Sequence, residues 1–344
     1  MAKTNALAPI TKDKSMGRVV IVDNFKGLLI LFFFFTHSYS FPSYLFEFPT
    51  WMHHSGGIVG IWTFFNFTLM DIGPIAFFFL IGLTMFKVFD KHVAKDGKKA
   101  AYKNFFARNL TVFGFFAAAT YIKNRLFHEN VDWENLHAIG ITGVFMLPFM
   151  FSFIRKNTWV RLVLGVAILT LYHFFYTQFQ FLWSNYAGGM TTCIGFMGVV
   201  FLASVIQDLV EKKRPWLYLG FSVLLFFAAW GAKEFFGDAV YKAYNSTYMI
   251  MCTFAMNTIY LVFYAIDRLF IRNRPIPLVA TVGRNILLYI LLTFLFVNVL
   301  MALQKAGTVP PFGVLAFIIF DVCVYTFFLL LARFLEKKRI IFKF

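Results

Sequence analysis

A histidine and a lysine stand eleven residues apart in the first apolar stretch, and their types could support group-transfer chemistry. Lys26 marks the cytoplasmic end of this stretch, and His37 lies about 16 Å deeper if the stretch is a helix. Imidazole titrates near neutral pH and therefore suits general-base catalysis. Ionisable groups inside a bilayer are costly and usually face the interior of the helix bundle. His37 is therefore a candidate base, and the alternative is a hydrogen-bonded core histidine.

The segment 51–74 carries further groups of this kind outside the membrane. His53 and His54 are adjacent, so only one of them can lie on a given helical face, but either could line the mouth of a cavity. Gly56-Gly57 would let the backbone turn back into the protein. Asp71 then opens the second apolar stretch, as a helix cap, as a partner for a histidine, or as both.

Four further charged residues lie within or beside apolar stretches. Asp321 is ten residues into the last stretch, where a carboxylate needs a partner, and Arg284 is the suggested one. Arg161 and Asp267 lie close to cytoplasmic ends, where their side chains can snorkel to the interface.

A basic segment, read as a cytoplasmic loop, runs from residue 90 to residue 108 and includes Arg108. Contact with anionic lipid is one interpretation. Attraction of a phosphorylated cytosolic donor, such as a coenzyme A ester, is the other. The chain has no glycine-rich phosphate loop of the strand-to-helix kind, which disfavours nucleotide hydrolysis.

The elements that must position these residues are long apolar helices. Of the 344 residues, 60% are hydrophobic, 14% are charged and 50 are Phe, and the mean hydropathy is +0.71. This composition predicts an all-α, polytopic membrane protein with about ten transmembrane helices. We expect the spans near 26–46, 72–89, 104–123, 137–154, 158–178, 188–208, 215–232, 247–267, 278–303 and 311–335.

The distribution of positive charge predicts the orientation. All but five of the 32 Lys and Arg fall on one side of the ten-span arrangement, so both termini are expected in the cytoplasm. We expect one transmembrane domain, 18–336, between basic cytoplasmic tails, 1–17 and 337–344, in the cell membrane. The net charge of +16 then indicates anionic lipids rather than nucleic acid. The three cysteines lie in apolar spans without metal-ligand spacing, so we predict no metal site.

The opening of the chain resembles that of integral-membrane acyltransferases. The type 3 acyltransferase and heparan-glucosaminide N-acetyltransferase-like families begin with Arg, a short gap, Asp, Arg-Gly and an apolar run. Here Arg18 and Asp23 are followed by Lys26-Gly27 and then by His37, at the type 3 spacing. Lys26 stands where those families usually carry Arg.

Other stretches resemble the second family. They are His53–Gly57, the run from Asp71 to Gly82 with its Pro and Phe residues, Arg108 at the start of the third span, and Gly283–Tyr289 with Arg284 and Asn285. The histidine that follows this Tyr in the family is missing. The resemblance is strongest over residues 18–120 and 278–292.

The resemblance implies transfer of an acyl group, usually acetyl, from cytosolic acyl-CoA. The acceptor would be a hydroxyl or amine of an extracytoplasmic glycan or lipid-linked sugar. His37 is the expected base, with Asp71 or another carboxylate orienting an imidazole. His53 or His54 is the second candidate, as base or acyl carrier. Lys26, Arg108, Arg284 and Asn285 are the expected donor-binding residues.

Two other classes remain open. A secondary transporter of a small polar or sugar-like solute would carry two-fold internal symmetry, which the sequence does not show. The other class is a scaffold without catalytic activity. In such a protein, Lys26 in place of the usual Arg and the missing histidine would reflect the loss of a catalytic site. The scaffold would tolerate joint substitution of His37, Asp71 and Asn285.

Overall fold

The computed structural model describes residues 20–39, 70–127, 135–178, 189–212, 214–239, 244–272, 274–305 and 314–341. These residues are almost entirely helical and contain no strand, which confirms the predicted all-α class for this part of the chain. The side chains of 34–39 are not described, and His53 and His54 lie outside the described residues.

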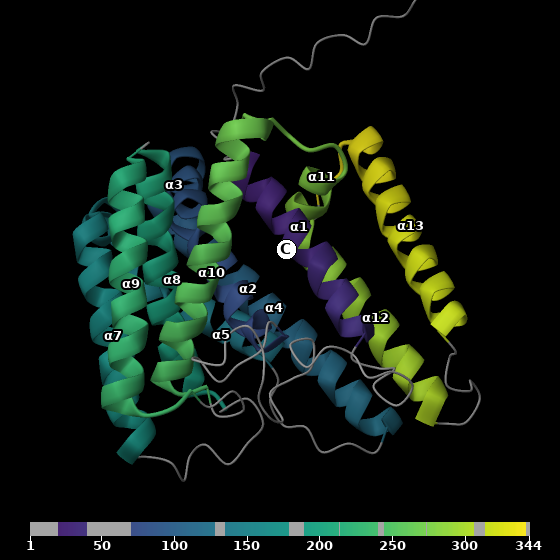
Figure 1. Ribbon diagram of the computed structural model, residues 1–344, viewed down its shortest axis with the longest axis horizontal. Coiled ribbons are helices and arrows are strands. Elements are labelled where there is room, and N and C mark those ends of the chain that lie inside the picture. Colours follow the sequence, from purple (N-terminus) through teal and green to yellow (C-terminus); the bar gives the residue numbers. More distant parts are fainter. Residues whose placement is uncertain are drawn as a thin grey trace, which may run out of the picture.

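The helices follow one another along the chain in the order shown in Figure 1. They are α1 (Val20–Tyr39), α2 (Gly73–Gly82), α3 (Met85–Asp96), α4 (Lys98–Phe127), α5 (Asn135–Phe145), α6 (Ser152–Lys156), α7 (Thr158–Gln178), α8 (Thr192–Glu211), α9 (Pro215–Phe236), α10 (Ser246–Ile266), α11 (Val279–Arg284), α12 (Ile286–Lys305) and α13 (Val314–Lys338). Short helical turns, η4 (Met70–Ile72), η5 (Leu147–Phe149) and η8 (Asp267–Ile271), flank some of them.

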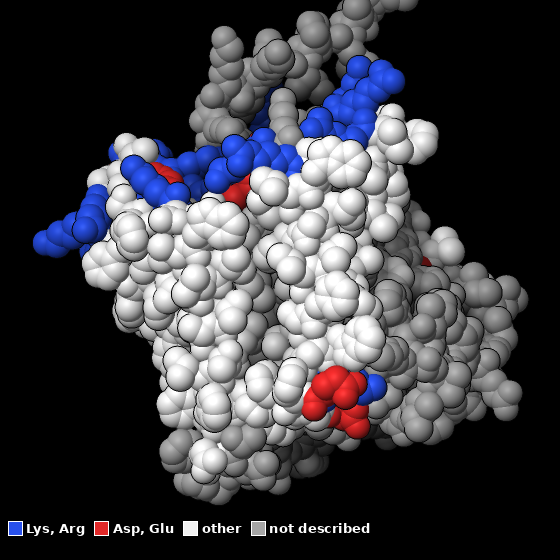
Figure 2. Space-filling view, turned by 60° about the vertical axis from the view of Figure 1, so that its left-hand side comes forward, with Lys and Arg blue, Asp and Glu red and all other residues white. Residues whose placement is uncertain are grey.

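Six of the described helical segments are long and apolar enough to cross a membrane. They are Gly73–Asp96, Lys98–Ile122, Thr158–Tyr176, Thr192–Glu211, Pro215–Phe236 and Ser246–Ile271. Figure 2 shows Lys and Arg gathered along one end of the molecule, above a wide zone without charge. Both features are those of a multi-pass membrane protein.

Helix α8 is the centre of one group of helices. About 83% of its apolar window is buried, against 28% for each of α4, α7 and α9. In Figure 1, α7, α9 and α10 stand beside α8, whereas α1, α11, α12 and α13 form a second group. Helices that expose most of their apolar surface are suited to lipid contact, so α8 is the helix that the protein itself covers.

The two groups of helices correspond to two apolar clusters. In the larger cluster Phe78 of α2 stacks on Phe196 of α8, with ring centroids 3.9 Å apart. In the smaller cluster Ile30 of α1 packs with Val282 of α11 and Phe328 of α13. Helix α1 contributes to both clusters and therefore lies where the two groups meet.

The prediction that 90–108 forms a loop is wrong. Helix α3 continues to Asp96 and α4 begins at Lys98, so Gly97 alone separates them. Gly97 has a φ of +82°, which an L side chain rarely adopts. A single residue in this conformation reverses the chain, and the basic residues therefore project from the ends of two helices.

Three predicted spans are interrupted within the described residues. The stretch 72–89 divides between α2, which ends at Gly82, and α3, which begins at Met85. The stretch 137–154 ends as α5 at Phe145, because Pro148 in η5 lacks the N–H that a continuing helix needs. The stretch 278–303 is broken at Asn285, whose side-chain amide donates to the Thr281 carbonyl at 2.9 Å. Such local side-chain bonds compete with regular helix geometry.

We predict that Gly82→Ala destabilises the protein by about 1–3 kcal/mol, because overpacking a helix contact forces the backbones apart. A Cβ at Gly82 would lie 2.6 Å from the Cβ of Ala203 and also overlap the backbone of Val200 on α8. Thermal unfolding in detergent, followed by circular dichroism, measures the change.

Gly114→Ala is the matched control, because no atom lies within 4 Å of a Cβ built there. Its higher helix propensity should leave stability unchanged or raise it by up to about 1 kcal/mol. Equal losses in both variants would contradict the close approach of α2 and α8.

Candidate functional site

The first half of α1 crosses α11 at backbone contact. A Cβ at Gly27 would overlap the carbonyl of Val279, and a Cβ at Gly283 would overlap the carbonyl of Asp23. Two glycines, one on each helix, therefore allow the two backbones to touch. The contact joins segments that are more than 250 positions apart in the sequence.

An ion pair spans this crossing. Arg284 Nε of α11 lies 3.8 Å from Asp23 Oδ2 of α1, with 28% and 15% of the two side chains exposed. Partial exposure limits the contribution of this pair to stability. The suggested pairing of Arg284 with Asp321 stays a prediction.

Asn24 holds the segment that leads into α11. Its buried side chain donates to the Arg274 carbonyl at 2.8 Å and accepts from the Ile276 N–H at 2.9 Å. Pro275 and Pro277 on either side of Ile276 have no N–H of their own. The Asn24 side chain thus makes two hydrogen bonds to the backbone of this segment.

Lys26 connects α1 to the second apolar segment. Its Nζ donates to Thr84 Oγ1 at 3.1 Å, and Thr84 occupies the break between α2 and α3. Phe25, the preceding residue, packs on Tyr260 and Phe263 of α10, with ring centroids 4.8 and 5.4 Å away. The predicted donor-contact lysine is therefore held at a junction of helices.

The other predicted donor-binding residues are Arg284, Asn285 and Arg108, which lie at the end of α11 and on α4. Asn285 is buried at the end of α11, next to Arg284. Arg108 is on an exposed part of α4. One turn later, Val112 packs in the same apolar cluster as Ile30 and Val282. Lys26, Arg284 and Asn285 are thus brought to one crossing, and Arg108 lies on the neighbouring helix.

The predicted catalytic residues are described only in part. His37 lies on α1, three turns beyond Lys26, and its side chain is outside the described part of the chain. Asp71 is fully buried in η4, and its carbonyl accepts a hydrogen bond from the Tyr248 hydroxyl of α10. Asp71 is therefore enclosed by protein.

The described residues also contain a polar network that sequence reasoning missed. Arg161 of α7 pairs with Asp208 of α8, and Thr158 donates to the same carboxylate at 2.6 Å. Lys87 of α3 pairs with Glu211 of α8. The expectation that Arg161 and Asp267 snorkel is wrong, because each is only 3% exposed. The apolar run around Arg161 gave no sign of a partner on another helix.

The network extends toward α1 through uncharged groups. Gln207 Nε2 donates to Glu211 at 2.7 Å, and the Tyr260 hydroxyl donates to Gln207 Oε1 at 2.9 Å. The Tyr260 ring is the one that packs on Phe25. Among the residues with described positions, no three His, Cys, Asp or Glu side chains form a group that could hold a metal ion.

We predict that Arg161→Met costs about 3–5 kcal/mol, because it leaves the Asp208 carboxylate, whose side chain is only 17% exposed, without its charge partner. The double variant Arg161→Met with Asp208→Leu should recover most of this loss, since both charges are then gone. Denaturant unfolding in detergent micelles compares the two. A double variant no more stable than Arg161→Met would show that the pair does not carry the effect.

No model of a known protein family matches this chain, and no curated protein matches it. Any function proposed for the chain therefore depends on the contacts of its own residues and on the motifs that they form.

Proposed function

We propose that the chain is a cell-membrane acyltransferase with about ten spans and both termini in the cytoplasm. It moves an acyl group, most simply acetyl, from cytosolic acyl-CoA to an acceptor outside the cytoplasm. The acceptor is a hydroxyl or amine of a glycan or of a lipid-linked sugar.

One observation carries the proposal. The two stretches of strongest resemblance to membrane acyltransferases are residues 18–120 and 278–292, and their helices α1 and α11 touch in the fold. Asp23 of the first stretch pairs with Arg284 of the second. Motifs far apart in sequence that meet at one crossing are expected of residues that serve one site.

The charges at the crossing suit a phosphorylated donor. Lys26 lies at the N-terminal end of α1, and Arg284 lies at the end of α11. Ammonium and guanidinium groups are the side chains that bind phosphate best. An acyl-CoA carries its phosphates far from its thioester, so cations near Lys26 can hold the donor while the thioester reaches deeper along α1.

His37 is the proposed base. It takes the proton from the acceptor hydroxyl or amine as the acceptor atom attacks the thioester carbonyl. The new C–O or C–N bond forms, the C–S bond breaks, and the coenzyme A thiolate leaves and takes up a proton. Asp71 orients an imidazole, and His53 or His54 stands as the alternative base or acyl carrier.

We predict that the purified protein binds acetyl-CoA and that His37→Ala lowers acyl transfer by about 100-fold to 10,000-fold, the usual contribution of a general base. Donor affinity should not change, because the imidazole acts on the acceptor. Calorimetry with acetyl-CoA and mass spectrometry of the acylated acceptor measure the two quantities.

His92→Ala is the matched control, because His92 is exposed on α3 and bonded only to Asp96 in the described structure. It should retain full transfer. Protein that binds a sugar-like solute but shows no affinity for acetyl-CoA would instead be a transporter. Full transfer by His37→Ala would remove His37 from the mechanism.

We also predict that Lys26→Ala weakens acetyl-CoA binding about tenfold, as expected for loss of one charge-assisted hydrogen bond. Lys26→Arg should retain the affinity, because the charge stays and a planar donor replaces it. Thr84→Val is the control, since it removes the Lys26 contact and leaves the charge in place. Equal weakening by Lys26→Ala and Thr84→Val would indicate a structural role for Lys26.

A further inference from the structure

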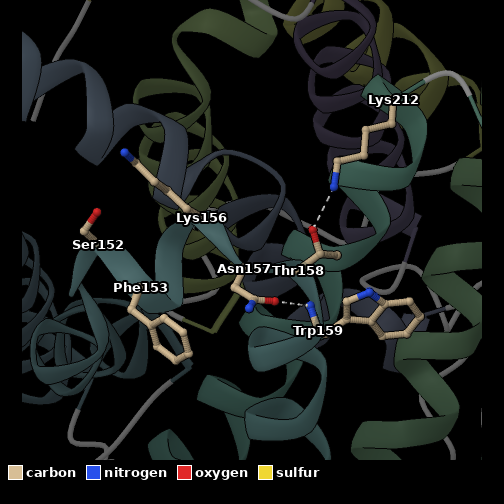
Figure 3. A pocket seen from close by; sticks show the side chains of 7 residues that line it. All are labelled: Ser152, Phe153, Lys156, Asn157, Thr158, Trp159 and Lys212. Carbon is tan, nitrogen blue, oxygen red and sulfur yellow. Dashed lines mark hydrogen bonds between the residues drawn. The ribbon is translucent and has the colours of Figure 1, made fainter.

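An open pocket of about 500 Å³ lies where α6, α7 and α8 meet (Figure 3). Its lining is Ser152, Phe153, Lys156, Asn157, Thr158, Trp159 and Lys212. Lys212 extends toward Thr158, and its Nζ donates to Thr158 Oγ1 at 3.1 Å. Lys156 and Phe153 project on the other side of Asn157. The pocket therefore combines two cations with two aromatic rings.

The acidic groups nearest the pocket are already neutralised. Asp208 accepts from Thr158 and pairs with the buried guanidinium of Arg161. Glu211, next to Lys212 in the chain, pairs with Lys87 of α3. The two pocket lysines thus keep a net positive charge facing outward, and a partner with negative charge complements them.

The pocket lies at the level where apolar helices end. The candidate span Thr158–Tyr176 begins in it, and the span Thr192–Glu211 ends one residue before Lys212. Trp159 is 74% exposed, and Trp216 at the start of the next span is 81% exposed. Exposed indoles beside the ends of apolar helices are the side chains that settle at the head-group level of a bilayer.

The end of α7 does not itself supply the binding groups. Asn157 Oδ1 accepts from the N–H groups of Trp159 and Val160 at 3.0 and 3.3 Å, so the first amides of the helix are capped from within. The charged donors that the pocket offers a ligand are the ammonium groups of Lys156 and Lys212, beside the neutral donors of Ser152, Asn157 and Trp159. Phe153 and Trp159 offer apolar surface next to them.

We propose that this pocket binds the head group of an anionic glycerophospholipid, with the lipid phosphate held between Lys156 and Lys212. The Trp159 and Phe153 rings contact the glycerol and the start of the acyl chains. A phosphate on an apolar tail fits this combination, because one pocket at the membrane boundary is lined by both cations and aromatic rings. The site is independent of the proposed acyl transfer.

Tryptophan quenching by brominated lipid tests the proposal on the full-length protein in detergent micelles. The difference in quenching between the wild type and Trp159→Phe is the signal from the pocket tryptophan. This Trp159-dependent quenching should occur at a lower concentration of brominated phosphatidylglycerol than of brominated phosphatidylcholine. Lys156→Ala and Lys212→Ala should each weaken the response to phosphatidylglycerol about fivefold and leave that to phosphatidylcholine unchanged.

The control variant is Lys337→Ala with Lys338→Ala, because these exposed lysines end α13, which is outside the pocket. It should respond like the wild type. Equal weakening in the control, or none in either pocket variant, would overturn the proposal. Loss of the Trp159-dependent quenching by phosphatidylglycerol when acetyl-CoA is added would also overturn the proposal. It would assign the pocket to a nucleotide phosphate.

Folding does not confound the result. Lys156→Ala is the decisive variant, since Lys212 contacts Thr158 and Lys156 is an exposed side chain at the end of α6. Its unfolding temperature should equal that of the wild type. A fivefold loss of lipid response at unchanged stability then reports binding alone.

Discussion

The fold depends on five consecutive residues of α1, each of which contacts a different part of the chain. Asp23 pairs with α11, Asn24 holds the turn before α11, Phe25 packs on α10, Lys26 bonds the α2–α3 break, and Gly27 touches the start of α11. An α-helix turns by about 100° per residue, so five successive residues face several directions around its axis. At this level α1 contacts the chain on several sides, whereas the next residue, Leu28, stays 39% exposed.

This constraint ties together the two groups of helices. Helix α10 belongs to the α8 group, whereas α11 belongs to the group with α12 and α13. One short run thus contacts both groups at once. The polar network reaches the same run, because Tyr260 packs on Phe25 and bonds Gln207 of α8. The ends of α3, α7, α8 and α10 are thereby linked to the position of α1.

The sequence predicts those parts of this structure that are encoded locally. Apolar length and composition identify the membrane helices, because each property belongs to a single segment. The α1 motif is recognisable for the same reason: Asp23, Lys26 and Gly27 follow one another closely. The sequence did not predict that two helices meet at Gly97. The charge of 90–108 made this segment resemble a loop, and a glycine permits more than one conformation.

The partners of these residues could not be predicted. Asn24 bonds a residue 250 positions away, and Arg161 pairs with an aspartate 47 positions away. Neither contact produces a periodic pattern in the sequence from which it could be predicted. Thr84 is one of many threonines near helix ends, and nothing beside it in the chain indicates that Lys26 selects it. Contacts between helices require the packing of the whole bundle, which no single stretch specifies.

The turn at Gly97 has a consequence for how the chain meets proteases. Five lysines lie between residues 91 and 103, a density that would make an extended loop an ideal tryptic site. Here those lysines project from hydrogen-bonded helices joined by a single glycine. A protease binds its substrate as an extended strand in its cleft. The hairpin formed by α3 and α4 contains no such extended segment between its two helices. This lysine-rich segment is therefore protected by its own backbone.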